Sequence, residues 1–215
     1  MQTEIKQVRY QHANTYETLN ELGAKTKNVW LVFHGIGFLS KYFLRYFDAL
    51  KEDENYVIAP QAPSKYYLDG KYRHVGASWL TRVDREQETE NVLNYIEKVI
   101  ENERIPSRCN LIVFGFSQGV SIATRLIAKT GLPCEKLVLY AGGLPNELTA
   151  NDFTSLLENK TKIYSIVGTE DEYINTERLE EETKRLNALF HGTAEQITFD
   201  GGHELKKEII NSLAD

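Results

Sequence analysis

The chain has 215 residues and a formal charge of −6 at neutral pH. Hydrophobic residues make up 41% and charged residues 26%, which is the balance of a globular protein rather than a disordered one. So small a net charge gives no electrostatic reason to expect nucleic acid or an anionic membrane as partner, nor does it favour acidic substrates. The length allows a full hydrophobic core, so we expect a single domain over residues 1–215.

Signals for export and membrane insertion are lacking in the sequence. The first ten residues have no apolar signal core, and no apolar run reaches the roughly 20 residues that a membrane-spanning helix needs. The two cysteines, Cys109 and Cys134, are too few for a disulfide scaffold. Each precedes a strand-like run, so we expect two buried or half-buried thiols on neighbouring strands. These features predict a cytoplasmic protein without a membrane-spanning segment.

Strand-like and helix-like segments alternate along the chain from residue 28 onward. The segment before residue 20 alternates only weakly and is compatible with an edge hairpin. Short apolar runs predict strands at 28–33, 56–59, 110–114, 136–140, 162–167 and 194–199. Amphipathic periodicity predicts helices at 86–100, 117–129, 177–190 and 204–213. This alternation predicts an α/β fold with a mostly parallel central sheet and helices on both faces.

Residues 60–85 interrupt the alternation. The stretch is long, rich in Tyr and without a clear period. A long irregular connection in a compact domain is usually functional or disordered, and its aromatic content argues against disorder. It is interpreted either as a surface loop that packs its own aromatic side chains or as a wall of a substrate site.

A nucleophile elbow is the most informative motif. The pattern G-x-S-x-G occurs at 115–119, directly after an apolar strand and directly before a helix pattern. A tight strand-to-helix turn strains the central residue and exposes its hydroxyl, while Gly115 and Gly119 avoid collisions across the turn. Ser117 is therefore the predicted nucleophile, and it needs a base to take its proton.

In α/β-hydrolases the acid and then the histidine follow the serine along the chain. Of the two histidines after Ser117, His191 ends a helix pattern, whereas His203 follows a strand and two glycines. We predict His203 as the base. Asp171, in the loop after the preceding strand, is the predicted acid that orients it; Glu170 is a rival and Asp200 a weaker one.

An oxyanion hole requires two backbone N–H donors close to the nucleophile. One should come from Gln118, the residue after the serine. The sequence His-Gly-Ile-Gly at 34–37 ends an early apolar strand, and we assign the Ile36 N–H as the second donor. His34 is expected to brace this loop rather than to transfer protons.

Together these motifs resemble the phospholipase/carboxylesterase family of α/β-hydrolases, which includes acyl-protein thioesterases and small carboxylesterases. The motifs are HGIG at 34–37, APQAP at 59–63, SW at 78–79, GFSQG at 115–119, YAGGLP at 140–145, GTEDEYI at 168–174 and GGH at 201–203. They span most of the chain in the family's order. The resemblance implies the same triad and oxyanion donors. Together with the Tyr-rich loop it indicates four substrate-binding residues: Gly37, Trp79, Tyr67 and Leu144.

The resemblance implies a serine hydrolase that cleaves carboxylic esters or thioesters through an acyl-serine intermediate. No metal or organic cofactor is required for this chemistry, and the expected partner is a small acyl ester or thioester. Two alternatives stay open: a hydrolase of another acyl bond, such as a peptide or a lactone, and a non-catalytic binding protein on a hydrolase scaffold. The sequence does not determine the acyl chain, the alcohol or thiol, or the oligomeric state.

Overall fold

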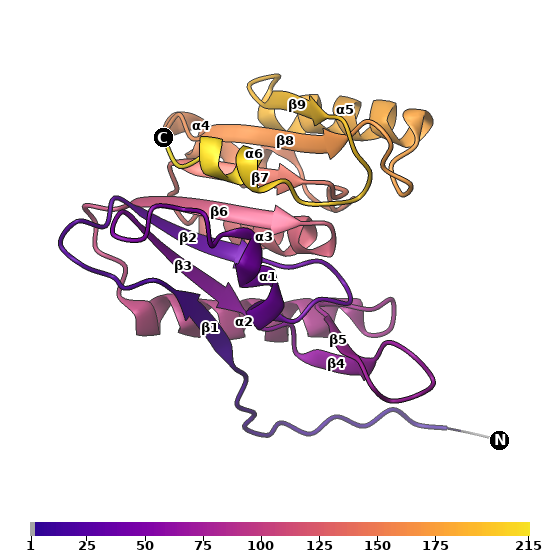
Figure 1. The fold of residues 1–215 in the computed structure, drawn as a ribbon. Coiled ribbons are helices and arrows are strands. Elements are labelled where there is room, and N and C mark those ends of the chain that lie inside the picture. The colour runs from indigo at the N-terminus through magenta and orange to yellow at the C-terminus, as the bar shows by residue number, and fades with distance from the viewer. Residues whose placement is uncertain (1–2) are drawn as a thin grey trace.

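A computed structural model describes residues 3–215 and is built around a seven-stranded sheet (Figure 1). The strand order is β1-β3-β2-β6-β7-β8-β9, and every neighbouring pair is parallel except β1 with β3. The predicted, mostly parallel sheet is therefore confirmed. The strands are β1 (Tyr16–Leu19), β2 (Asn28–Phe33), β3 (Asn55–Pro60), β6 (Asn110–Phe116), β7 (Lys136–Tyr140), β8 (Lys162–Gly168) and β9 (Glu195–Phe199).

Helices cover both faces of this sheet, as expected. On one face lie α2 (Arg85–Glu103), α3 (Gln118–Thr130) and α5 (Thr176–Phe190); on the other lie α1 (Ser40–Phe43) and α6 (Lys207–Ser212) (Figure 1). Side chains alternate between the two faces of a strand. Because Val29 to Phe33 are all apolar, β2 presents apolar side chains to both faces of the sheet. Val29 and Leu31 join the core with α2 and α3, whereas Trp30 and Val32 join the core with α1 and α6.

The parallel register brings the carboxyl ends of the strands to one edge of the sheet. Phe33 at the end of β2 pairs with Gly115 on β6, and Gly168 at the end of β8 pairs with Phe199 at the end of β9. The loops that follow these strands carry residues 34–37, 117, 169–175 and 200–206. Ligands of open α/β sheets bind at this edge, so the loops are brought together where a site is expected.

Some expected elements differ from the structure. Residues 3–19 contribute one strand, β1, at the sheet edge, so the predicted edge hairpin was wrong. The stretch 60–85 is less irregular than expected, because β4 (Ser64–Tyr67) and β5 (Val75–Ser78) form an antiparallel hairpin. The last helix begins at Lys207 rather than at 204, because the chain first turns through Gly201 and Gly202.

Four short helical elements of residues 3–215 have no counterpart in the sequence periodicity, since each is shorter than two helical turns. They are α1 (Ser40–Phe43), the 3₁₀ helices Leu44–Tyr46 and Ala150–Phe153, and α4 (Thr154–Glu158). Cys134 is buried and Cys109 is half-buried, both as free thiols, which confirms their predicted burial.

Within residues 3–215, every helix is too short or too polar to span a bilayer. The single domain stays a prediction.

Candidate active site

Ser117 occupies the predicted tight turn between β6 and α3. Its backbone lies at φ 53° and ψ −118°, a conformation that L-residues rarely adopt. The Ser117 N–H donates to the Tyr140 carbonyl over 2.8 Å, which fixes the strained turn to the neighbouring strand β7. Backbone strain of this kind is kept only where the surrounding contacts enforce it. The Ser117 hydroxyl is therefore held in a fixed position.

Both glycines of the elbow are required by close backbone approach. A Cβ atom on Gly115 would collide with the backbone of Gly119, and a Cβ on Gly119 would collide with the Phe33 carbonyl oxygen. The turn therefore packs α3 directly against the end of β2. This contact places the nucleophile beside the loop that follows β2.

His203 lies in the loop after β9, with its ring directed at the elbow. The Nε2 atom is 2.9 Å from Ser117 Oγ, and the ring packs against Phe116 and Tyr173 at centroid distances of 5.1 and 4.8 Å. The other ring nitrogen, Nδ1, is 2.8 Å from Asp171 Oδ2. The two nitrogens thus join the serine hydroxyl to a carboxylate in one chain of hydrogen bonds.

The Asp171 side chain is fully buried, unlike its rivals. Its Oδ1 accepts N–H bonds from Tyr173 and Ile174 over 2.9 and 3.1 Å, leaving Oδ2 for His203. A carboxylate accepts only, so His203 must donate from Nδ1, and Nε2 is left to accept the serine proton. Glu170 and Asp200 are exposed and make no hydrogen bond to His203 within the described chain.

Glu172 is a residue of the site that sequence reasoning missed. Its Oε2 accepts the backbone N–H of His203 over 3.1 Å, so it fixes the loop that carries the imidazole. The signal was present in the motif at 168–174, where an acidic residue directly follows Asp171. Only the fold shows that this side chain reaches the loop after β9.

The two expected oxyanion donors, Ile36 and Gln118, line the same cavity as Ser117. Among residues 3–215, neither backbone N–H donates to another protein group. The Gln118 side chain is held by two hydrogen bonds of 2.8 Å. Its Oε1 accepts from the backbone N–H of Trp79, and its Nε2 donates to the Leu80 carbonyl. The next N–H, that of Gly37, donates to Ala77 and is not available to a substrate.

His34 is completely buried behind the Ile36 loop. Its Nε2 accepts from the Ala62 N–H over 3.1 Å, so its Nδ1 donates to the Gly35 carbonyl over 2.8 Å. Burial lowers the pKa of His34 to about 4, because the imidazolium would lose its hydration. A neutral imidazole bonded at both nitrogens agrees with the predicted bracing of the loop.

The lowered pKa of His34 makes stability depend on pH. The unfolded chain binds a proton near pH 6.5, whereas the folded His34 binds it only near pH 4. Stability is therefore lost as pH falls from about 6.5 to about 4, by about 3 kcal/mol from this residue. Urea unfolding at pH 7, 5.5 and 4.5 should show a steep fall for the wild type and a shallower one for His34→Gln. Equal slopes in the two proteins would contradict this origin.

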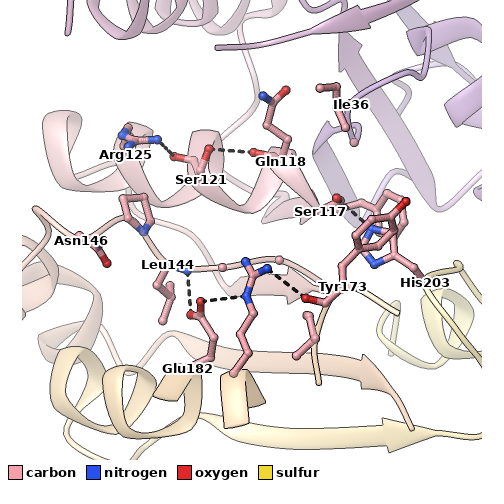
Figure 2. A pocket seen from close by; sticks show the side chains of 18 of the residues that line it. Ile36, Ser117, Gln118, Ser121, Arg125, Leu144, Asn146, Tyr173, Glu182 and His203 are labelled. Atoms are coloured by element: carbon pink, nitrogen blue, oxygen red, sulfur yellow. Dashed lines mark hydrogen bonds and ion pairs between the residues drawn. The ribbon is translucent and has the colours of Figure 1, made fainter. Parts of the chain in front are cut away.

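A cavity of about 750 Å³ opens beside Ser117 and His203 (Figure 2). Leu144 lines it, as the sequence predicted, but the other three predicted substrate residues do not. Trp79 is 1% exposed and packs on Phe33 and His34, so it supports the site from behind. Tyr67 lies on the exposed β4–β5 hairpin against Tyr72, and Gly37 faces that hairpin.

Much of the cavity wall is polar and was not expected from the sequence. It includes Ser121 and Arg125 from α3, Arg85 from α2, the loop after β7, and side chains from α5. Ser121 and Arg125 lie four residues apart in α3, which places both on one face of the helix that begins directly after Ser117. That spacing was a readable signal. The other contributions come from distant elements that only the fold brings together.

Within residues 3–215 no group of three or more His, Cys, Asp or Glu side chains is arranged to hold a metal ion.

The sheet order, the elbow after β6 and the converging loops define an α/β-hydrolase. The family model of the phospholipase/carboxylesterase family matches residues 14–215, and the chain belongs to that family of hydrolases. The sequence matches none of the curated proteins with which it was compared.

Several solved structures have the same fold, and three of them illustrate the similarity. Acyl-protein thioesterase 2 from Zea mays is 15% identical, with a TM-score of 0.70 over 94% of this chain and 96% of that one. A phospholipase/carboxylesterase from Dyadobacter fermentans is 19% identical, with a TM-score of 0.66 over 96% and 98%. The carboxylesterase from Bacillus cereus is 16% identical, with a TM-score of 0.64 over 94% and 92%. At these identities the likeness concerns the fold.

Proposed function

We propose that this protein is a serine hydrolase that cleaves carboxylic ester or thioester bonds through an acyl-serine intermediate. The observation that carries the proposal is the chain of hydrogen bonds from Ser117 through His203 to the buried Asp171. The family match supports hydrolysis, and the geometry supports this particular route.

In the first half of the reaction, Ser117 Oγ attacks the carbonyl carbon while His203 Nε2 takes the hydroxyl proton. The N–H groups of Ile36 and Gln118 hold the negative charge that forms on the carbonyl oxygen. As the tetrahedral intermediate collapses, the bond to the alcohol or thiol breaks and His203 returns the proton to the leaving group. Asp171 stabilises the imidazolium that exists between these two transfers.

In the second half, a water molecule replaces the leaving group. His203 takes a proton from the water, the resulting hydroxide attacks the acyl-serine carbonyl, and the same two N–H groups hold the second oxyanion. Collapse breaks the bond to Ser117, which regains the proton from His203, and releases the carboxylic acid. Each proton that His203 accepts is returned, so the enzyme ends as it began.

A fluorophosphonate probe tests the proposal, because it reacts only with a serine whose proton is taken by a neighbouring base. We expect labelling of the wild-type protein and none of Ser117→Ala. Ser212→Ala is the matched control, since this exposed serine on α6 bonds only the Ile209 carbonyl; it should label normally. Equal labelling of Ser117→Ala, or no labelling of the wild type, contradicts the proposal.

A further inference from the structure

The cavity has a cationic end remote from the catalytic residues. Ser121 and Arg125 share one face of α3, which begins directly after Ser117, and Arg125 Nη1 donates to the Ser121 carbonyl over 3.4 Å. Figure 2 shows Arg125 and Asn146 on the opposite side of the cavity from Ser117 and His203. The Arg125 side chain is only 9% exposed, so its guanidinium is largely withdrawn from water.

The carboxylates that line the cavity are already bonded within the protein. Glu147 accepts from Arg125, Glu182 accepts the Leu144 N–H over 3.0 Å, and Glu172 accepts the His203 N–H over 3.1 Å. Each of the three carboxylates is thus partly satisfied by a protein donor, which reduces its attraction for a cationic substrate.

The arginines, by contrast, keep unused donors. Arg125 directs both Nε and Nη2 at a single oxygen of Glu147, over 2.8 and 2.7 Å. A guanidinium has five N–H groups, so N–H groups on Nη1 and Nη2 stay available. Arg85, the first residue of α2, also lines the cavity and forms no ion pair with any carboxylate of residues 3–215. A third arginine, Arg178, is held by the Tyr173 carbonyl over 3.0 Å and lies 4.0 Å from Glu182.

The unused arginine N–H donors favour a substrate that carries a negative charge. An alkyl chain lying against Arg125 would remove water from N–H groups without replacing its hydrogen bonds, which is unfavourable. An anionic oxygen there would accept charge-assisted bonds from Arg125 and attract Arg85. Arg125 lies seven residues beyond the first residue of α3, a rise of about 10 Å, and its side chain leans back toward the start of the helix. The guanidinium and the Ser117 hydroxyl are therefore separated by about 6–12 Å.

We propose that the preferred substrates are esters or thioesters that carry an anionic group, such as a carboxylate, bound by Arg125 and Arg85 at this end of the cavity. This inference rests on the proposed function, which supplies the reaction, and adds the chemical class of the substrate. The preference for an anionic substrate does not depend on the net charge of the chain, because it comes from Arg125 and Arg85 alone.

Matched pairs of esters test the preference. One series compares mono-p-nitrophenyl esters of straight-chain dicarboxylic acids, from succinate to suberate, with p-nitrophenyl esters of alkanoic acids of equal length. A second series compares butyrate esters of ω-hydroxy acids with butyrate esters of simple alcohols. We expect kcat/KM to favour the anionic member about ten- to hundredfold in one series, with a best chain length. The series that responds shows whether the acyl or the alcohol part reaches Arg125.

Variants identify the groups responsible. Arg125→Gln and Arg85→Gln should each reduce the preference by about tenfold while the neutral esters are still hydrolysed. Glu147→Gln should increase it several-fold, because the Arg125 guanidinium loses its internal partner. A purely structural Arg125–Glu147 pair would instead slow both esters in either variant. Lys129→Gln, one turn further along α3, and Arg82→Gln, just before α2, remove the same charge outside the cavity and should leave the preference unchanged.

Binding separates failure of this inference from failure of the proposed function. Calorimetry with Ser117→Ala should show monomethyl adipate or its best-length homologue binding at least tenfold more tightly than the dimethyl ester, whether or not any ester is hydrolysed. Equal binding of the two overturns the charge preference even if the wild-type protein is an active esterase. Hydrolysis of neutral and anionic esters at equal rates in both series also overturns it and leaves the proposed function intact.

Discussion

Asp171→Asn is expected to lower kcat for ester hydrolysis by about 10⁴-fold. Asp171 accepts from His203 Nδ1 over 2.8 Å, which leaves Nε2 as the acceptor for the Ser117 proton. An asparagine can present its NH₂ group to Nδ1, and the imidazole proton then moves to Nε2. That nitrogen would face Ser117 as a donor and could no longer serve as a base. Initial rates with p-nitrophenyl butyrate measure the loss.

Glu170→Gln is the matched control, since it removes a carboxylate one residue earlier in the same loop. Glu170 is exposed and is held through its backbone, whose N–H donates to Gly201 over 2.9 Å. Its kcat should stay within about threefold of the wild-type value, and both variants should unfold at wild-type temperature within a few degrees. If Glu170→Gln abolishes turnover and Asp171→Asn does not, the acid has been assigned to the wrong residue.

Gly119→Ala is expected to destabilise the protein by about 3 kcal/mol or more. Helix propensity alone favours alanine over glycine by about 1 kcal/mol, so the sign of the effect is itself informative. The new Cβ would collide with the carbonyl oxygens of Phe33 and His34. These atoms belong to β2 and to the loop that carries Ile36, and neither can move without disturbing the sheet or the oxyanion donor. Urea unfolding measures the change in the free energy of unfolding.

Gly23→Ala is the control for Gly119→Ala. No atom lies within 4 Å of a Cβ built on Gly23, and its backbone is not in the left-handed region. Its free energy of unfolding should change by less than about 0.5 kcal/mol. A comparably small change for Gly119→Ala would mean that the elbow can relax, and the close packing of α3 on β2 would not be essential.

The sequence predicted the sheet and the serine, acid and histidine positions for the same physical reason. Buried parallel strands are apolar on both faces, so runs such as 28–33 and 110–114 stand out, and Ser117 follows one of them. His203 follows β9, a half-exposed edge strand whose signal was weaker. Strand β4 lacked this signal because Lys65, Tyr66 and Tyr67 are all exposed, and an exposed strand has no apolar face to mark it. Strand β5 is mostly buried, but its buried residues are Gly, Ala and Ser, which do not form an apolar run.

The cavity was harder to predict, since its wall combines side chains from elements far apart in the chain. Leu144 was expected to line the substrate site. In the sequence, Arg125 looks like an ordinary polar residue of a surface helix, and only the fold places the loop after β7 beside it. Trp79 lies away from the cavity wall. Its motif pointed to the substrate pocket, yet the indole Nε1 donates to the His34 carbonyl over 2.8 Å, and the ring is buried. Its contribution to the site is to position the loop after β2.

The placement of β2 between β3 and β6 has a consequence for synthesis of the chain. Asn28 pairs with Asn55 on one side and with Asn110 on the other, so one edge of β2 finds its partner only after about half the chain has been made. Until then a strand that is apolar from Val29 to Phe33 has an open edge, which favours pairing with other chains. Nascent chains should therefore be most prone to aggregate, and most dependent on chaperones, before β6 emerges from the ribosome.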